Sequence, residues 1–142
     1  MKASNLEAEF VRFAKEKIVP SVHKALCESL GIKSVVEVEA NGKSKFYGFR
    51  GFGCGFTYVE YDKRSKKAKQ IEKLARDYRK QVWEQVEDMF QYKVIRELEE
   101  NGTPIRALLF QDINCQNAYY QEVADFMKEQ GAKNVYVVSR LD

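Results

Sequence analysis

Residues 105–139 read IRALLFQDINCQNAYYQEVADFMKEQGAKNVYVVS, and this stretch decides the class of fold. Residues 105–110 form a short apolar run that is typical of a buried strand. Residues 116–130 are predicted to form a helix that Gly131 closes, and residues 134–139 have the pattern of a final strand. A strand, a helix and a second strand in this order form a βαβ unit, for which we expect parallel strands and a right-handed crossover.

A meander of antiparallel strands is predicted on the N-terminal side of this unit. Residues 35–39 alternate and are rich in β-branched side chains, which is typical of a strand. Asn41 and Gly42 follow them, and this pair is the strongest short signal for a hairpin. The return arm over residues 45–61 has the length of one bent strand or of two strands with a break among the glycines.

Helical spacing of apolar residues marks two further segments. One helix is predicted over residues 5–30, and Pro20 is expected to kink or divide it because proline lacks a backbone donor. A second helix is predicted over residues 64–100, and the breakers Gly102 and Pro104 follow it. A helix of that length would span roughly 54 Å, which is more than the diameter of a compact domain of this size.

These segments indicate a single domain of the α+β class over residues 1–142. We expect a mixed sheet with an antiparallel meander followed by βαβ units, in the order α-β-β-(β)-α-β-α-β, and one long helix. A chain of 142 residues buries roughly 70% of the surface that its unfolded form exposes. With 44% hydrophobic and 32% charged residues, the composition is that of an ordered globular protein.

The composition also indicates the cellular environment. No apolar run approaches the ~20 residues that cross a bilayer, and the first residues lack a secretory core. We therefore expect a cytoplasmic protein without a membrane partner. The three cysteines, Cys27, Cys54 and Cys115, are far apart, and His23 is the one histidine. Neither a disulfide framework nor a metal site is expected, and no cofactor is predicted.

Charge is unevenly distributed, although the net charge is only +3. Residues 41–80 carry twelve Lys and Arg against four Asp and Glu, whereas residues 81–130 carry four against ten. The long predicted helix thus begins basic and ends acidic, which opposes the helix macrodipole. Three explanations are open: a polyanion binds the basic half, two copies pair antiparallel through the helix, or the face is merely solvated. The cations of the basic half are Lys66, Lys67, Lys69, Lys73, Arg76, Arg79 and Lys80.

The most distinctive segment is KFYGFRGFGCGFTY at residues 45–58. Residues 50–53 (RGFG) resemble the start of the RNP1 motif of RNA-recognition domains, and residues 135–137 (VYV) resemble their RNP2 motif. The resemblance implies stacking of bases on aromatic rings. It ends at Cys54 and Gly55, and the two motifs stand in reversed order. The alternatives are a phosphate-binding glycine loop and interlocking of Phe and Gly in the core.

Carboxylates suggest a metal-dependent nuclease as a further alternative, because such enzymes hold Mg²⁺ with two or three of them. The order of elements is similar to restriction-endonuclease-like nucleases, and residues 60–63 (EYDK) resemble their Glu-x-Lys motif, one residue out of step. It is also similar to ribonuclease-H-like folds. That second resemblance implies a pair formed by Glu37 or Glu39 with Asp112.

The turn after residues 105–110 is a candidate ligand site, since ligands bind at the carboxyl ends of strands in parallel sheets. Its candidate residues are Asp112, Asn114, Cys115 and Asn117. Cys115 lies near the start of a predicted helix, where its pKa is expected to fall. In the alternative interpretation, Asp112 or Asn114 caps the helix and Cys115 is packed in the core.

The first prediction is a non-catalytic protein that binds a polyanion, above all nucleic acid, through a basic and aromatic hairpin and the start of the long helix. One alternative is a dimeric protein-interaction module, such as a small inhibitor or adaptor. Another is a domain that binds a small molecule or nucleotide or acts as a nuclease. The predicted contacts are Lys43, Lys45, Phe46, Tyr47, Phe49, Arg50, Lys63, Arg64, Lys66, Lys67 and Lys69.

Overall fold

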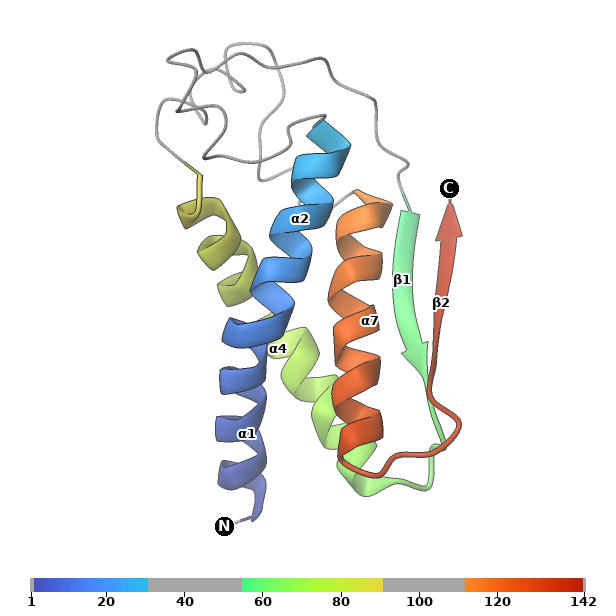
Figure 1. Ribbon diagram of the computed structural model, residues 1–142. Helices are drawn as coiled ribbons and strands as arrows, with labels where there is room; N and C mark the ends of the chain where they lie inside the picture. The colour runs from blue at the N-terminus through green and yellow to red at the C-terminus, as the bar shows by residue number, and fades with distance from the viewer. Residues whose placement is uncertain (1, 31–54, 91–111, 142) are drawn as a thin grey trace.

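A computed structural model describes residues 2–30, 55–90 and 112–141 of the chain. The described part is mainly helical and contains one small antiparallel sheet of two strands (Figure 1). The predicted mixture of helices and strands is confirmed at this level. The elements are α1 (Lys2–Phe13), η1 (Ala14–Ile18), α2 (Val19–Leu30), β1 (Gly55–Glu60), α4 (Lys66–Asp88), α7 (Ile113–Glu129) and β2 (Tyr136–Leu141).

The two strands β1 and β2 pair antiparallel, with Gly55 opposite Leu141. β1 falls within the predicted return arm of the meander, and β2 overlaps the predicted final strand. The predicted strands at residues 35–39 and 105–110 lie outside the described residues, and so do the hairpin and the parallel pairing of the βαβ unit. The detailed order of the sheet therefore stays a prediction.

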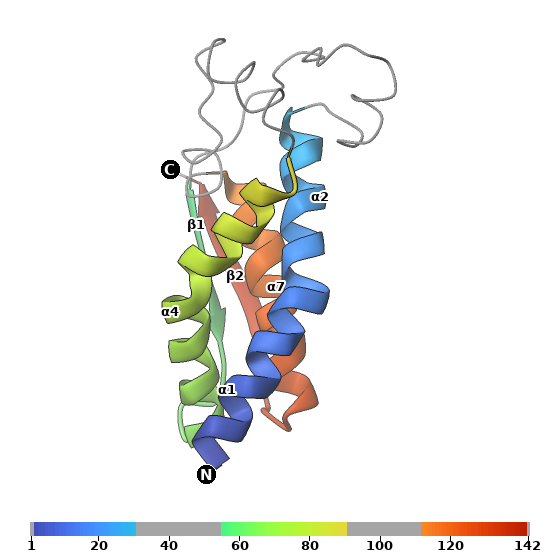
Figure 2. The ribbon, with the colours of Figure 1, turned by 90° about the vertical axis from the view of Figure 1, so that its left-hand side faces the viewer.

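The N-terminal helices α1 and α2 follow one continuous helical path through the π-helical segment η1 (Figure 1). The backbone N–H of Val19 donates to the carbonyl of Ala14, five residues back. This wider turn lies just before Pro20, which has no N–H to donate and whose ring would crowd the preceding turn of a regular helix. The π turn lies at the predicted kink or division, and the axis of α2 continues to Leu30 in a direction different from that of α1 (Figures 1 and 2).

The longest described helix is α4, with 23 residues and a length of about 35 Å. Its N-cap is Ser65, whose hydroxyl accepts a backbone N–H of the first turn at 3.1 Å. The helix ends at Asp88, so the prediction of an uninterrupted helix to Glu100 is wrong. The chain turns at Met89 and Phe90, and Phe90 is buried with its ring centroid 5.0 Å from that of His23 on α2.

Both ends of α7 carry a defined cap. At its start the Asp112 carboxylate accepts the backbone N–H of Asn114 at 3.3 Å, which confirms one of the predicted caps. At its end Gly131 has a φ of 92°, in the left-handed region that favours glycine. The N–H of Ala132 donates to the carbonyl of Met127 at 2.9 Å, as in a Schellman motif. The predicted closure by Gly131 is therefore confirmed.

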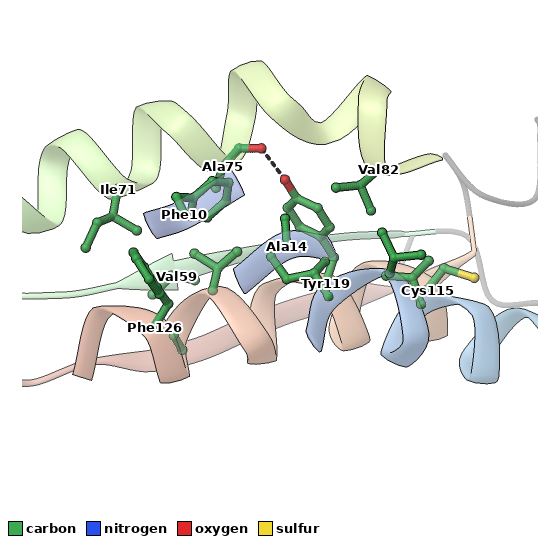
Figure 3. Packing of buried hydrophobic residues seen from close by; sticks show 14 of the residues in the cluster. Phe10, Ala14, Val59, Ile71, Ala75, Val82, Cys115, Tyr119 and Phe126 are labelled. Atoms are coloured by element: carbon green, nitrogen blue, oxygen red, sulfur yellow. Dashed lines mark hydrogen bonds between the residues drawn. The ribbon is translucent and has the colours of Figure 1, made fainter. Parts of the chain in front are cut away.

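One buried cluster joins the helices to β1 (Figure 3). Phe10 of α1 meets Phe126 of α7 and Tyr78 of α4 edge to face, at 5.5 Å and 6.2 Å between ring centroids. Tyr119 of α7 donates its hydroxyl to the carbonyl of Ala75 on α4. α7 lies between α2 and the sheet, and α4 crosses the N-terminal helices obliquely (Figures 1 and 2).

Candidate nucleic-acid interface

Five cations form one row along the exposed face of α4, and we name this row the basic stripe. The steps between its members alternate between three and four residues, so they fall within roughly 80° of the helix circumference. From first to last the stripe covers about 21 Å. All five residues are exposed, and they are Lys66, Lys69, Lys73, Arg76 and Lys80.

The amphipathic pattern of α4 directs the stripe outward. The opposite side of the helix packs against α1, α2 and α7, which leaves the charged side to solvent (Figure 2). The orientation of the stripe is therefore fixed by burial of the apolar face. The buried residues of α4 are Ala68, Ile71, Ala75, Val82, Trp83 and Val86.

Charges within α4 both oppose and support the stripe. Lys69 and Lys73 stand four residues apart, as do Arg76 and Lys80, and each like-charged pair costs about 0.2–0.5 kcal/mol. Glu72 with Arg76 and Lys73 with Asp77 are opposite charges at the same spacing, and they offset this cost. The first turn of α4 contains no acidic residue, so Lys66 faces the positive end of the helix dipole. Among the described residues, no carboxylate lies within 4.0 Å of any stripe cation. Their charge is therefore not compensated by an ion pair in this part of the chain.

The loop before α4 holds two further predicted contacts. The guanidinium of Arg64 donates to both carboxylate oxygens of Asp62 at 3.0 Å, so its charge is partly neutralised. Hydrogen bonds from the side chain and the backbone of Arg64 lower the pKa of Asp62 to about 2. The Lys63 ammonium lies 4.1 Å from the ring centroid of Tyr61. Of the two cations, Lys63 is the one without a carboxylate partner among the described residues.

The structure brings some of the predicted contacts together and separates others. Lys66 and Lys69 lie on the stripe, but Lys67 lies roughly 140° around the helix from its middle. The other three members of the stripe are missing from the predicted set, although their spacing in the sequence already indicates one helix face. The predicted contacts that lie outside the described residues are Lys43, Lys45, Phe46, Tyr47, Phe49 and Arg50.

Lys67→Glu is expected to stabilise the protein by about 0.3–1 kcal/mol at low salt, because a carboxylate in the first turn meets the positive end of the helix dipole. The gain should shrink between about 20 mM and about 500 mM salt as the charges are screened. Urea unfolding followed by circular dichroism measures both effects. A variant that is less stable than the wild type at low salt would contradict this account of the first turn.

The predicted ligand turn contains a buried carboxylate. Asp112 is 0% exposed. Its Oδ2 accepts the hydroxyl of Ser29 at 2.5 Å and the thiol of Cys115 at 3.2 Å. Ser29 in turn accepts the side-chain amide of Asn114 at 3.3 Å. These bonds hold the end of α2 against the start of α7, as a buried carboxylate requires.

A second group of hydrogen bonds connects the same turn to β1. The backbone N–H of Thr57 donates to Oε1 of Gln116 at 3.0 Å, and its hydroxyl donates to Oδ1 of Asn117 at 2.7 Å. Burial raises the pKa of the Cys115 thiol far above its ordinary value, and the charge of Asp112 adds to this. The expected fall of the Cys115 pKa is therefore wrong, and Cys115 is packed. Binding of a ligand at this turn stays a prediction.

The two nuclease alternatives use carboxylates at opposite ends of α7. The N–H of Asp62, within the first motif, donates to the carbonyl of Lys133, just beyond the C-terminal end of α7, whereas Asp112 of the second pair caps its N-terminal end. The 17 residues of α7 separate these two positions by about 25 Å, so the two alternatives would place a metal ion at different sites. In the described ranges, no three His, Cys, Asp or Glu side chains form a group that would hold a metal ion. Glu37 and Glu39 lie outside those ranges.

Among the described residues, the basic stripe is thus the charged surface whose members and alignment are known. No family model, curated protein or solved structure matches this chain. No helix among the described residues has the length and apolar character needed to cross a membrane. The function is therefore inferred from the geometry of the stripe and of its surroundings.

Proposed function

We propose that this protein binds a polyanion without catalysis, that the polyanion is nucleic acid, and that the basic stripe of α4 contacts its phosphates. The observation that carries the proposal is the alignment of five exposed cations on one helix face over about 21 Å. Nucleic acids present phosphates in regular rows, and Lys and Arg gain affinity there by releasing condensed counterions.

The proposal has a quantitative consequence for salt dependence. Each neutralised phosphate contributes a slope of about −0.7 for single strands and about −0.9 for duplex DNA to the logarithm of affinity against the logarithm of salt concentration. Five contacts therefore predict a slope of about −3.5 to −4.5. Affinity should fall by about 100- to 500-fold between 50 mM and 200 mM salt.

Reversing three charges of the stripe is expected to abolish this binding. In the triple variant Lys66→Glu, Lys69→Glu, Lys73→Glu, three phosphate contacts become repulsions. We expect at least a 100-fold loss of oligonucleotide affinity at about 100 mM salt, and a salt slope that is smaller in magnitude by about 2 to 3. Fluorescence anisotropy of a labelled oligonucleotide, titrated at several salt concentrations, measures both quantities.

A matched control separates the stripe from net charge. Lys15, Lys17 and Lys24 are exposed on η1 and α2, and their replacement by glutamate changes the net charge by the same amount. The control variant should bind the oligonucleotide far more tightly than the stripe variant. Its slope of log affinity against log salt concentration should keep at least half of the wild-type value. Equal losses in the two variants would show that binding follows overall charge, and the assignment to the stripe would then fail.

Pairing of two copies through α4 is the second candidate. After Lys80, the exposed side of α4 carries acidic residues at Glu84 and Asp88, so an antiparallel copy would set acids against the stripe. The homodimer is distinguished by mass, because light scattering would give twice 16.5 kDa for the wild type and a lower value for the stripe variant. Loss of mass together with unchanged oligonucleotide affinity would favour the dimer over nucleic acid.

A further inference from the structure

The two-stranded sheet has one covered and one open face. Thr57 and Val59 point toward the helices and are buried, and Thr57 is bonded to α7. Side chains alternate between faces, so the residues between and beside them on β1 point the other way. Across the register, the open face pairs Phe56 with Arg140, Tyr58 with Val138 and Glu60 with Tyr136.

Aromatic rings dominate this open face. Phe56 is 46% exposed and Tyr136 is 57% exposed, which is unusual for large apolar side chains in a protein with an extensive core. The rings of Phe56 and Tyr58 lie nearly parallel, at 21°, with centroids 6.3 Å apart. Two aromatic side chains of this face are thus accessible to solvent, and the ring of Tyr58 lies beside that of Phe56.

The charge of the face contrasts with that of α4. Arg140 and Glu60 stand at opposite ends of the face and balance one another, so the aromatic face itself is close to neutral. β1 leads into the stripe through only the five residues 61–65. The hydroxyl of Tyr61 donates to Oε1 of Glu72 at 2.7 Å, which holds the end of β1 against α4. The end of β1 is thereby anchored to the helix that carries the stripe.

We infer that the open face of the sheet, through Phe56, Tyr58 and Tyr136, stacks the bases of single-stranded nucleic acid whose phosphates follow the stripe. This inference rests on the proposed function and deepens it by naming the strandedness of the ligand. Proteins that bind single strands combine a cationic track for the backbone with aromatic side chains for the bases. Duplexes enclose the faces of their bases, so only a single strand can use both surfaces.

The charge pattern favours this occupant over a second copy of the chain. A homodimeric contact through the same face would set Arg140 of one copy against Glu60 of the other, but it would leave the cations of the stripe without a partner. A single strand supplies phosphates for the stripe and flat apolar rings for the neutral face. Both properties of the surface then have a partner.

The test compares a double variant, Phe56→Ala with Tyr136→Ala, against the wild type. The probes are a labelled thymidine oligonucleotide of about 20 nucleotides, the corresponding uridine oligonucleotide, and a duplex of the same length at about 50 mM salt. We expect both single strands to bind about 10-fold more weakly or worse, because each stacked base contributes substantially to affinity. Duplex affinity and the salt slope should stay unchanged, because no cation has been removed.

Two controls identify the cause of any loss. Tyr136→Phe keeps the ring and should retain wild-type affinity for single strands. Met89→Ala removes another exposed apolar side chain, which is 43% exposed at the end of α4, and should have no effect. Thermal unfolding of each variant shows that the fold is intact.

The outcomes separate this inference from the proposed function. If the double variant binds single strands like the wild type, stacking on the sheet is overturned while the stripe stands. Equal losses for single strands and duplex would also overturn it. If the wild type shows no salt-dependent binding to any probe, the proposed function fails and the inference fails with it. If the double variant has a lower mass in light scattering than the wild type but binds the oligonucleotides equally well, the open face would be assigned to a second copy of the chain.

Discussion

Phe10→Ala is expected to lower the free energy of unfolding by about 3–5 kcal/mol. Phe10 is 0% exposed and stands where α1, α4 and α7 meet (Figure 3). Its ring contacts those of Tyr78 and Phe126. Truncation removes its transfer free energy, leaves a cavity that rigid neighbours cannot fill, and deletes two edge-to-face contacts. Since a domain of this size is stable by only about 5–15 kcal/mol, one substitution would remove a large part of the total.

Urea unfolding followed by circular dichroism measures this loss as a lower transition midpoint. Phe56→Ala is the matched control, because the same ring is removed from an exposed position and the cost should stay below about 1 kcal/mol. Similar losses at the two positions would contradict the placement of Phe10 at the centre of the core. The control also shows that Phe56 is dispensable for folding, as the stacking proposal requires.

Asp112→Ala is expected to cost about 1.5–5 kcal/mol, since two effects combine at one buried side chain. Loss of the N-cap of α7 costs about 0.5–2 kcal/mol. The hydroxyl of Ser29 also loses its acceptor inside the protein, which costs about 1–3 kcal/mol more. The same unfolding experiment measures the sum.

Asp125→Ala is the control for this prediction. Asp125 lies on α7 as well, but it is exposed, so its replacement should change stability by no more than about 0.5 kcal/mol. In the double variant Ser29→Ala with Asp112→Ala, both partners are removed and part of the loss should be recovered. A cost below about 1 kcal/mol for Asp112→Ala alone would show that its buried hydrogen bonds contribute little.

Local signals in the sequence predicted both caps of α7 well. Gly131 and Asp112 act through backbone geometry and hydrogen bonds within a few residues, so their roles can be recognised without the rest of the fold. The end of α4 could not be recognised in this way. The apolar spacing continues past Asp88, so periodicity alone does not mark the point at which the helix ends.

The candidate site could be predicted from the sequence only where it depends on local patterns. The alternating spacing of cations on α4 is a local pattern, and it indicates one helix face once the helix is recognised. The open face of the sheet depends on pairing between β1 and β2, whose residues are far apart in the chain. Exposure of Phe56 and Tyr136 follows from that register and from the position of α7, which no local pattern specifies.

The π turn at η1 changes the direction in which the side chains of α1 point relative to those of α2. The buried residues Leu6, Phe10, Val22 and Leu26 belong to a series with a constant spacing of four. In a regular helix of 3.6 residues per turn, the first and last of them would point roughly 200° apart. The wider turn unwinds the rod of α1, η1 and α2 between its halves, so that one side of it can face α4 and α7 along its full length.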